Sequence, residues 1–261
     1  MNRALRTIFF QSAVWLTPLV SRAADERVIM EAPVRVVASA SPDVFPESWC
    51  KSPVLASGEE LPEEEFERVR KILGRALAKY PPQILQADLK AVYVLAELRY
   101  SGVITSGTNS RTCVYLKIGD EKKGFTDTHI ESVFHAEFSS ILLRNHARHF
   151  DKEAWQAVNP PGFRYLGNGV DAVKQKKAGL KLSDALHEIG FLKEYSQSTL
   201  ENDFNALANL LFSGDANLWE ISARFPKIRR KVDLALAFYQ KLDPAFTELY
   251  FRSFTKQNVA R

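Results

Sequence analysis

The sequence predicts an α+β fold in which a small sheet precedes a mostly helical C-terminal half. Runs rich in β-forming residues lie in the first half of the chain, at 34–37, 91–95 and 113–118. Segments with apolar residues at helical spacing dominate from residue 128 onward. Strands that come first and helices that come later are typical of α+β domains. With 261 residues, 46% of them hydrophobic, the chain is long enough to bury a large core.

Residues 1–23 are predicted to be a secretory signal peptide. Arg3 and Arg6 precede an apolar run at 8–20, and small residues at 21–23 suit a cleavage site. A buried N-terminal helix is the alternative. No Cys follows the run as in a lipoprotein, and no later segment is long and apolar enough to span a bilayer. We therefore expect an exported protein, periplasmic or secreted, with no integral membrane segment after signal cleavage.

Net charge and cysteine content argue against two kinds of function, nucleic-acid binding and a cysteine-ligated zinc site. Loss of Arg3, Arg6 and Arg22 with the signal peptide lowers the net charge from +4 to +1, which leaves no electrostatic footprint for nucleic acid. Cys50 and Cys113 are far apart in sequence and do not make a zinc site. In an oxidising compartment they form one disulfide, or they are two buried free thiols, and the sequence leaves both possibilities open.

Residues 24–58 are expected to form an N-terminal extended segment, with a strand at 34–37 and a polar, proline-containing loop after it. Residues 59–261 are expected to form a single domain. Pro62 and the three glutamates after it predict a helix start, because proline suits the first helical position and acids suit the positive end of the helix dipole. Apolar residues then recur at helical spacing as far as Tyr80.

The strands at 91–95 and 113–118 are expected to be neighbours. Between them, Ser101-Gly102 and the segment 105–110, which is rich in Ser, Gly and Thr, are expected to form turns. A helix over 128–148 is apolar around much of its circumference, so it should be largely buried. Residues 59–150 thus contain the sheet and this central helix.

Residues 151–261 are expected to be helical after a long connecting segment. Thr199 is expected to cap a helix that runs through Leu211. Pro226 is expected to open a long helix, and a short helix should start near Pro244.

Glu137 lies on the central helix in a context that points toward metal hydrolases. Four of the five histidines fall within 128–150. In a His-Glu-x-x-His helix, two imidazoles stand four residues apart on one face and the Glu beside the first acts as general base. Here Ala136 precedes Glu137 and Ser140 follows three residues later. A methyl and a hydroxyl therefore replace the two imidazoles.

The segment 134–142, Phe-His-Ala-Glu-Phe-Ser-Ser-Ile-Leu, resembles the active-site helix of zinc metallopeptidases of the bacterial envelope. This family belongs to the zincin group, with the lethal-factor and Pro-Pro endopeptidase type, and typically reads His-Glu-Phe-x-His-Ile-Leu there. Downstream, its members carry a catalytic Tyr and, seven residues later, a Glu zinc ligand. In this chain Tyr195 is followed seven residues later by Asn202. The similarity in layout extends over about 62–254, with two short motif-like windows.

The resemblance implies a zincin-like domain, with a small mixed sheet packed on a buried helix of the active-site type. Carried over residue by residue, it makes Glu137 the general base and Tyr195 the group that stabilises the oxyanion. Ala136, Ser140 and Asn202 stand at the three zinc-ligand positions. A catalytic zinc needs three protein ligands and a water, so we expect no zinc in the standard arrangement and no cofactor.

A different ligand set is the alternative. Glu131 and His135 lie four residues apart on one helical face, with His129 close in sequence. An ordinary i,i+4 pair between Glu131 and His135 explains the same spacing without a metal. Glu137 also has a structural interpretation, because a buried carboxyl needs a hydrogen-bond partner. That partner can come from one of three polar residues, Ser140, Tyr195 or Asn202.

Three functions follow from these patterns. The first is a catalytically inactive zincin-like protein that binds a peptide or protein in its residual cleft. The second is an active zinc metallopeptidase with non-standard ligands, which would need zinc as cofactor. The third is an unrelated α+β binding protein whose motif similarity is due to chance.

Overall fold

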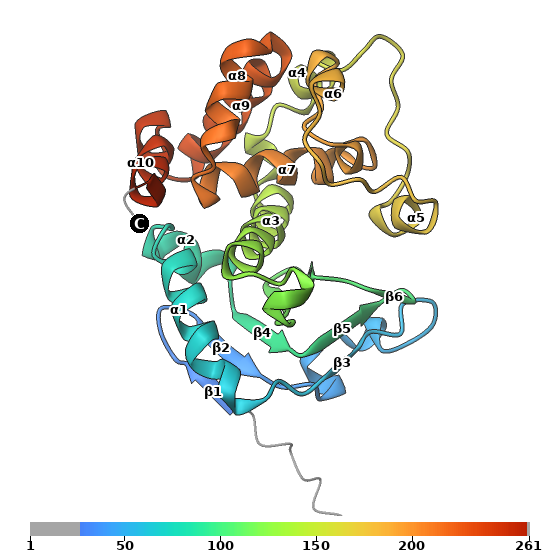
Figure 1. Ribbon diagram of the computed structural model, residues 1–261, viewed down its shortest axis with the longest axis vertical. Coiled ribbons are helices and arrows are strands. Elements are labelled where there is room, and N and C mark those ends of the chain that lie inside the picture. The colour runs from blue at the N-terminus through green and yellow to red at the C-terminus, as the bar shows by residue number, and fades with distance from the viewer. Residues whose placement is uncertain (1–26, 260–261) are drawn as a thin grey trace, which may run out of the picture.

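The computed structural model describes residues 27–259, so the expected signal peptide at 1–23 lies outside the described part. The chain folds into a lower half that contains the strands and an upper half of C-terminal helices, with helix α3 between them (Figure 1). This confirms an α+β fold with a helical C-terminal half. No helix within 27–259 has the length and apolar character needed to cross a membrane.

The main sheet is small and mixed, as expected. Its order is β1-β2-β4-β8-β7. The strands β2, β4 and β8 are parallel to one another, whereas β1 and β7 are antiparallel to their neighbours and form the two edges. The five strands are β1 (Arg27–Met30), β2 (Arg35–Ala38), β4 (Ala91–Leu95), β7 (Gly107–Asn109) and β8 (Cys113–Lys117). The predicted strands at 91–95 and 113–118 are therefore neighbours in the sheet.

A second sheet is antiparallel and has the order β3-β5-β6. Its strands are β3 (Ser57–Glu59), β5 (Glu97–Tyr100) and β6 (Val103–Ile104). Between β2 and β3 the chain forms two short 3-10 helices, η1 (Pro42–Val44) and η2 (Glu47–Trp49). The N-terminal segment expected to be extended thus supplies two strands to the main sheet.

The chain turns at Ser101-Gly102 as expected, but the expectation of turns over 105–110 was wrong in part, because this segment contains the edge strand β7. Gly107 and Asn109, on either side of Thr108, have little β-propensity of their own. Their extended backbone is fixed by pairing with β8, in which Thr108 lies opposite Tyr115 and Gly107 opposite Leu116. Non-local pairing of this kind leaves no pattern in the local sequence.

Helices α3 and α7 each begin directly after a threonine that caps them, which confirms the predicted cap at Thr199. The hydroxyl of Thr126 accepts from the His129 N–H at the start of α3, and that of Thr199 accepts from the Asn202 N–H at the start of α7. Pro226 opens α9, whereas the last helix begins four residues after Pro244. The helices of the first half are α1 (Phe66–Leu77), α2 (Pro82–Asp88) and α3 (Asp127–Asn145). Those of the second half are α4 (Lys152–Ala157), α5 (Gly169–Lys174), α6 (Asp184–Glu188), α7 (Leu200–Ser213), α8 (Ala216–Arg224), α9 (Pro226–Leu242) and α10 (Glu248–Val259).

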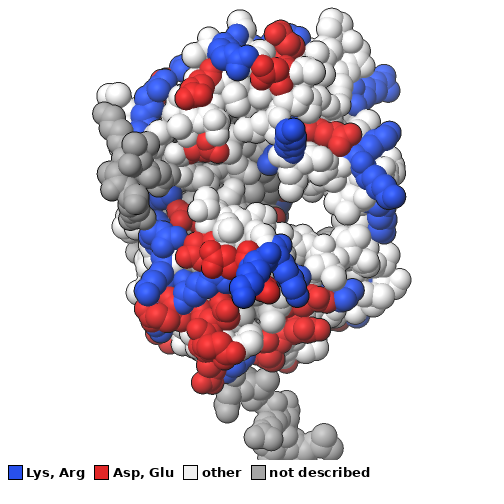
Figure 2. Space-filling view, in the orientation of Figure 1, with Lys and Arg blue, Asp and Glu red and all other residues white. Residues whose placement is uncertain are grey.

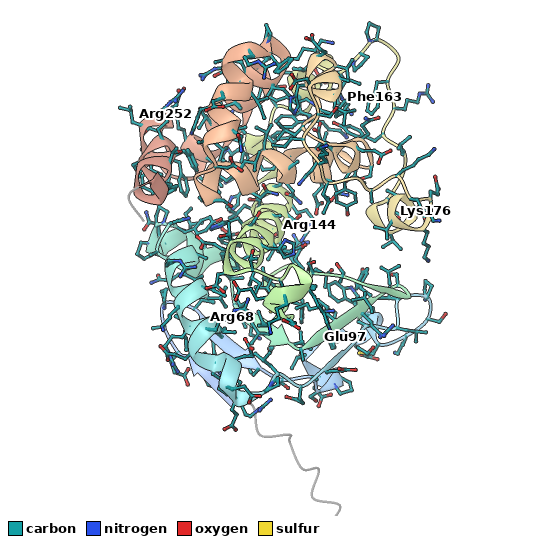
Figure 3. All side chains as sticks on the ribbon, viewed as in Figure 1. Arg68, Glu97, Arg144, Phe163, Lys176 and Arg252 are labelled. Carbon is teal, nitrogen blue, oxygen red and sulfur yellow. The ribbon has the colours of Figure 1, made fainter. Side chains whose placement is uncertain are left out.

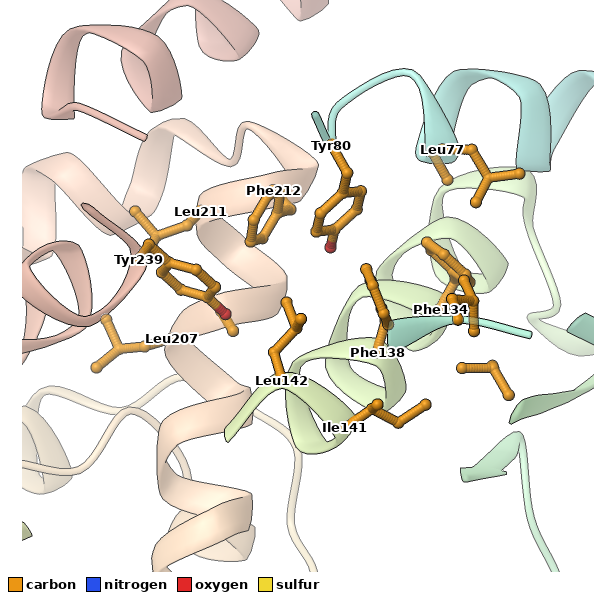
Figure 4. Close-up of a cluster of buried hydrophobic side chains, with 14 of the residues drawn as sticks. Leu77, Tyr80, Phe134, Phe138, Ile141, Leu142, Leu207, Leu211, Phe212 and Tyr239 are labelled. Atoms are coloured by element: carbon orange, nitrogen blue, oxygen red, sulfur yellow. The ribbon is translucent and has the colours of Figure 1, made fainter. Parts of the chain in front are cut away.

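The core is built around α3, which packs on the sheet, on α1 and on α7. Between α3 and α7, the ring of Tyr80 stacks on Phe212 at 4.3 Å and meets Phe138 edge-on at 4.9 Å (Figure 4). All three side chains are buried. This aromatic packing fixes the rotation of α3 about its axis, and with it the residues that α3 turns toward the edge strand β7.

Cys50 and Cys113 are both free thiols. They belong to the smaller hydrophobic cluster on the other face of the main sheet, together with Tyr93 and Tyr115. In this structure the two cysteines therefore contribute apolar packing rather than a cross-link.

Candidate functional site

A cleft lies between the edge strand β7, helix α3 and the start of α7. It has a narrow compartment with a volume of about 380 Å³ and a wider one of about 610 Å³. The space-filling view shows a hollow between the sheet half and the helical half, and Arg144 lies on the α3 side of it (Figures 2 and 3). Both compartments are lined by Thr105, Gly107, Glu137, Val173, Tyr195, Asn202 and Asn205.

Glu137 sits under the edge strand, on the floor of the cleft. Asn109 of β7 donates a side-chain hydrogen bond to its carboxylate. A Cβ atom at Gly107 would lie 3.0 Å from the Glu137 Cγ and 2.5 Å from Val133, so only glycine lets the strand approach α3 this closely. Burial raises the pKa of the Glu137 carboxyl to about 7, against the opposing effect of the Asn109 hydrogen bond.

Arg144 connects both walls of the cleft to Glu137. Its guanidinium donates to Glu201 at 2.7 Å, to the side-chain oxygen of Asn109, and to the Ser110 carbonyl at 2.9 Å. A continuous chain of hydrogen bonds therefore runs from Glu201 on α7 through Arg144 and Asn109 to Glu137. Because Arg144 holds the amide oxygen, the amide nitrogen of Asn109 is the atom that faces the carboxylate.

Tyr195 and Asn202 form the opposite wall. A Cβ atom at Gly169 would lie 2.4 Å from the Tyr195 hydroxyl and 2.9 Å from the Asn202 amide nitrogen, so both side chains press against the first residue of α5. Asn202 also donates to the Ser198 hydroxyl at 2.8 Å. Burial, and after it the negative charge of Glu137, raises the pKa of Tyr195 to about 12. Its phenol therefore stays protonated and can donate a hydrogen bond into the cleft.

The three positions that the resemblance assigns to zinc ligands line the same cleft as Glu137. Ser140 and Asn202 line the narrow compartment, and Ala136 and Asn202 line the wider one. The Ser140 hydroxyl accepts a hydrogen bond of 2.6 Å from Asn205. A methyl, a hydroxyl and a carboxamide do not fit the nitrogen, thiolate and carboxylate preference of zinc. Within residues 27–259, no three His, Cys, Asp or Glu side chains are grouped closely enough to hold a metal ion.

The alternative ligand set is divided between two environments. Glu131 pairs with Lys79 at 2.7 Å, and the His135 ring contacts the Tyr80 hydroxyl at 2.9 Å on the buried side of α3. His129 instead contacts the Ser106 hydroxyl at 3.2 Å and lines the wider compartment of the cleft. Burial lowers the pKa of His135 to about 4, which keeps its ring neutral. His135 lies 3.7 Å from Glu131, as the i,i+4 spacing predicts.

Sequence reasoning missed three residues that shape the site. Asn109 and Arg144, rather than a residue of α7, hold Glu137 in place, and Asn205 holds Ser140. One signal for Asn205 was present, because polar residues at helical spacing form a stripe along the otherwise apolar α7. The stripe comprises Ser198, Asn202, Asn205 and Asn209.

Glu137→Gln is expected to flatten the pH dependence of stability between about pH 4.5 and 7. In this interval the folded state keeps the Glu137 proton that the unfolded chain releases, so the free energy of unfolding of the natural protein falls as pH rises. A pKa change of this size corresponds to a loss of up to about 3 kcal/mol. The variant should therefore be the more stable protein at pH 8.

Urea unfolding of both proteins at pH 4.5 and pH 8 measures this difference. The lower pH serves as an internal control, because both side chains are mostly neutral there and the two stabilities should agree. Equal changes in stability between the two pH values would show that Glu137 ionises normally in the folded protein.

One cleft brings together two distant parts of the chain, Glu137 and Ser140 of α3 and the segment with Tyr195 and Asn202. Ala136 lies in its wider compartment. The arrangement offers one carboxyl with a raised pKa, one phenol donor and a row of amides. It can form hydrogen bonds with the polar backbone groups of a ligand. Comparison with protein-family models, curated proteins and solved structures finds no match to this chain.

Proposed function

We propose that this chain is an exported, zincin-like protein that binds an extended peptide or protein segment in the cleft and does not hydrolyse it. The observation that carries the proposal is the edge strand β7, which runs along α3 directly over Glu137. A strand edge beside a row of hydrogen-bonding side chains is suited to strand addition by a peptide.

The backbone of β7 supports this mode of binding. Lys117 donates to the Ser106 carbonyl at 2.9 Å, and Ser110 donates to the Cys113 carbonyl at 2.8 Å. Since hydrogen bonding alternates along an antiparallel strand, Gly107 and Asn109 direct their backbone groups away from β8. In the described part of the chain no strand pairs with that side. The Gly107 carbonyl accepts from the Thr105 hydroxyl at 2.8 Å, a contact that a peptide strand would replace.

The zincin-like part of the proposal is supported by the mixed sheet with its antiparallel edge strand against α3. It is also supported by the meeting of Glu137, Tyr195 and Asn202 in one cleft. The inactive part is supported by the side chains at the ligand positions, since neither Ala136 nor Ser140 supplies a usual zinc donor. Export depends on the composition of residues 1–23.

Val173→Arg is expected to abolish or strongly weaken peptide binding. Val173 lies on α5, lines both compartments and is 43% exposed, so a longer charged side chain can be accommodated without unfolding the protein and would cross the cleft mouth. Peptides selected from a random displayed library on the natural protein should bind this variant at least about tenfold more weakly, a change of 1.4 kcal/mol. Fluorescence polarisation measures the affinities.

Leu249→Arg is the matched control, because Leu249 is an exposed apolar residue of α10 outside the cleft. It should bind the selected peptides like the natural protein. The selected peptides should also remain intact by mass spectrometry, with or without added zinc. Failure to select any peptide, or equal binding by both variants, would contradict the proposal. Chelator-sensitive cleavage that Glu137→Gln abolishes would favour the metallopeptidase alternative instead.

A further inference from the structure

Lys193 places a positive charge in the wall of the wider compartment. It directly precedes the short 3-10 helix η6 (Glu194–Gln197) and is half-buried. Within residues 27–259 its ammonium group has neither an ion-pair partner nor a hydrogen-bond partner. Burial lowers the pKa of Lys193, and no carboxylate acts in the opposite direction. Charged groups removed from water are normally paired. We therefore expect the Lys193 ammonium group to pair with an anionic group of a ligand.

A second basic side chain lies close to Lys193. His129 lines the same compartment, and its pKa is lowered by burial and then by the charge of Lys193. The acids of the compartment are engaged elsewhere. Glu137 is held by Asn109, and Asp215 caps the start of α8 by accepting from the Asn217 N–H at 2.9 Å. The compartment therefore has one basic region with no anion of its own.

Apolar side chains line a further part of this compartment, and its rim exposes large hydrophobic side chains. Ile104 of β6, Val173 of α5 and Leu180 are 49%, 43% and 62% exposed. In the ribbon view α5 lies opposite β6 (Figure 1), and both elements contribute residues to the wider compartment. Further inside, Leu182 and Leu192 continue the apolar wall. Exposed apolar side chains that gather at the mouth of a cleft are typical of a binding surface.

We propose that the wider compartment binds a carboxylate-bearing peptide segment with large apolar side chains, and that Lys193 pairs with the carboxylate. This inference rests on the proposed function, because it assumes that a peptide occupies the cleft. It adds to the proposed function which peptides the cleft prefers, namely those with a carboxylate and large apolar side chains. The carboxylate is either the C-terminus of the peptide or an Asp or Glu side chain within it, since both present the same two oxygens.

Four labelled nonapeptides with the same leucine- and phenylalanine-rich sequence test this preference. Two have a neutral interior and end in a free carboxylate or in a carboxamide. The other two end in a carboxamide and carry one internal Glu or Gln. The natural protein should bind at least one carboxylate peptide about tenfold or more tightly than its neutral counterpart. The pair that shows the difference identifies the source of the carboxylate.

Lys193→Met should remove this preference and leave the affinity for the neutral peptides unchanged. Lys193→Arg should retain it, because the cation is kept. Lys174→Met is the matched control on the exposed surface of α5 and should behave like the natural protein. The thermal midpoint of Lys193→Met should equal or exceed that of the natural protein, since an unpaired, half-buried charge is lost.

The two proposals fail in different ways. If the peptides bind and Val173→Arg blocks them, but Lys193→Met weakens acid and neutral peptides equally or not at all, only the role of Lys193 is overturned. The same holds if the natural protein does not distinguish acid from neutral peptides. If none of the peptides binds the natural protein, both proposals are overturned.

Discussion

Asp203→Asn is expected to lower the free energy of unfolding by about 3–5 kcal/mol, because it leaves a buried ammonium without its counter-ion. The Asp203 carboxylate lies 2.6 Å from the Lys231 ammonium, and the two side chains are 2% and 0% exposed. The same carboxylate accepts from the indole of Trp155 at 2.9 Å and from the hydroxyl of Tyr165 at 2.8 Å. The substitution preserves the volume of the side chain and removes its charge. Urea unfolding at neutral pH measures the loss.

Asp233→Asn is the matched control, since it breaks an ion pair of the same length in an exposed setting. Asp233 lies 2.6 Å from Arg229 on α9, and both side chains are more than one third exposed. Exposed pairs contribute roughly 0–1 kcal/mol, so this variant should unfold close to the natural protein. Similar losses in the two variants would show that the Asp203 pair is open to water.

The Asp203–Lys231 ion pair also explains which residues of α7 face the cleft. Asp203 directs its carboxylate into the interior toward Lys231 on α9 and Trp155 on α4. Its neighbour Asn202 therefore points the other way, into the cleft, and Asn205 follows one turn later on the same side. Its three partners, Lys231, Trp155 and Tyr165, place the Asp203 carboxylate in the core. The fixed rotation of α7 results from this buried charge.

The elements that sequence reasoning predicted well are those whose own residues carry the signal. The strand at 91–95 is apolar on both faces because both faces of the sheet are covered, and the capping hydroxyl of Thr199 marks the start of α7. The helices α4, α5 and α6 are only five or six residues long, too short for a periodic pattern to stand out. β7 is fixed by its partner strand, so its sequence resembles a turn.

The sequence likewise predicted some residues of the candidate site and not others. The spacing from Tyr195 to Asn202 and the surroundings of Glu137 pointed to one cleft, and those residues do line one cleft. The partners that set their chemistry could not be predicted, because Asn109 and Arg144 act through contacts between β7 and α3. The raised pKa of Glu137 likewise comes mainly from burial, which depends on how the edge strand covers it.

The triple change Ala136→His, Ser140→His and Asn202→Glu is expected to create a tight zinc site. Two imidazoles four residues apart on α3 and a carboxylate on α7 would supply three ligands and leave one position for water. The buried side-chain oxygen of Asn205 has no hydrogen-bond partner within the described residues. It can accept from an imidazole introduced at position 140 and orient that ring. The variant should bind one zinc ion at least about 1,000-fold more tightly than the natural protein, a difference of roughly 4 kcal/mol.

A matched variant separates a shared site from simple binding by two imidazoles. It carries the same two histidine substitutions, but its new carboxylate replaces the exposed Asn217 on α8. Metal analysis and competition with a coloured chelator should give clearly tighter zinc binding for the first variant alone, and zinc should raise only its thermal midpoint strongly. If both variants bind zinc equally, the carboxylate at position 202 does not meet the imidazoles. The proposed zincin-like character would then lose its support, whereas peptide binding along β7 would still stand, because it depends on the strand edge and not on the ligand positions.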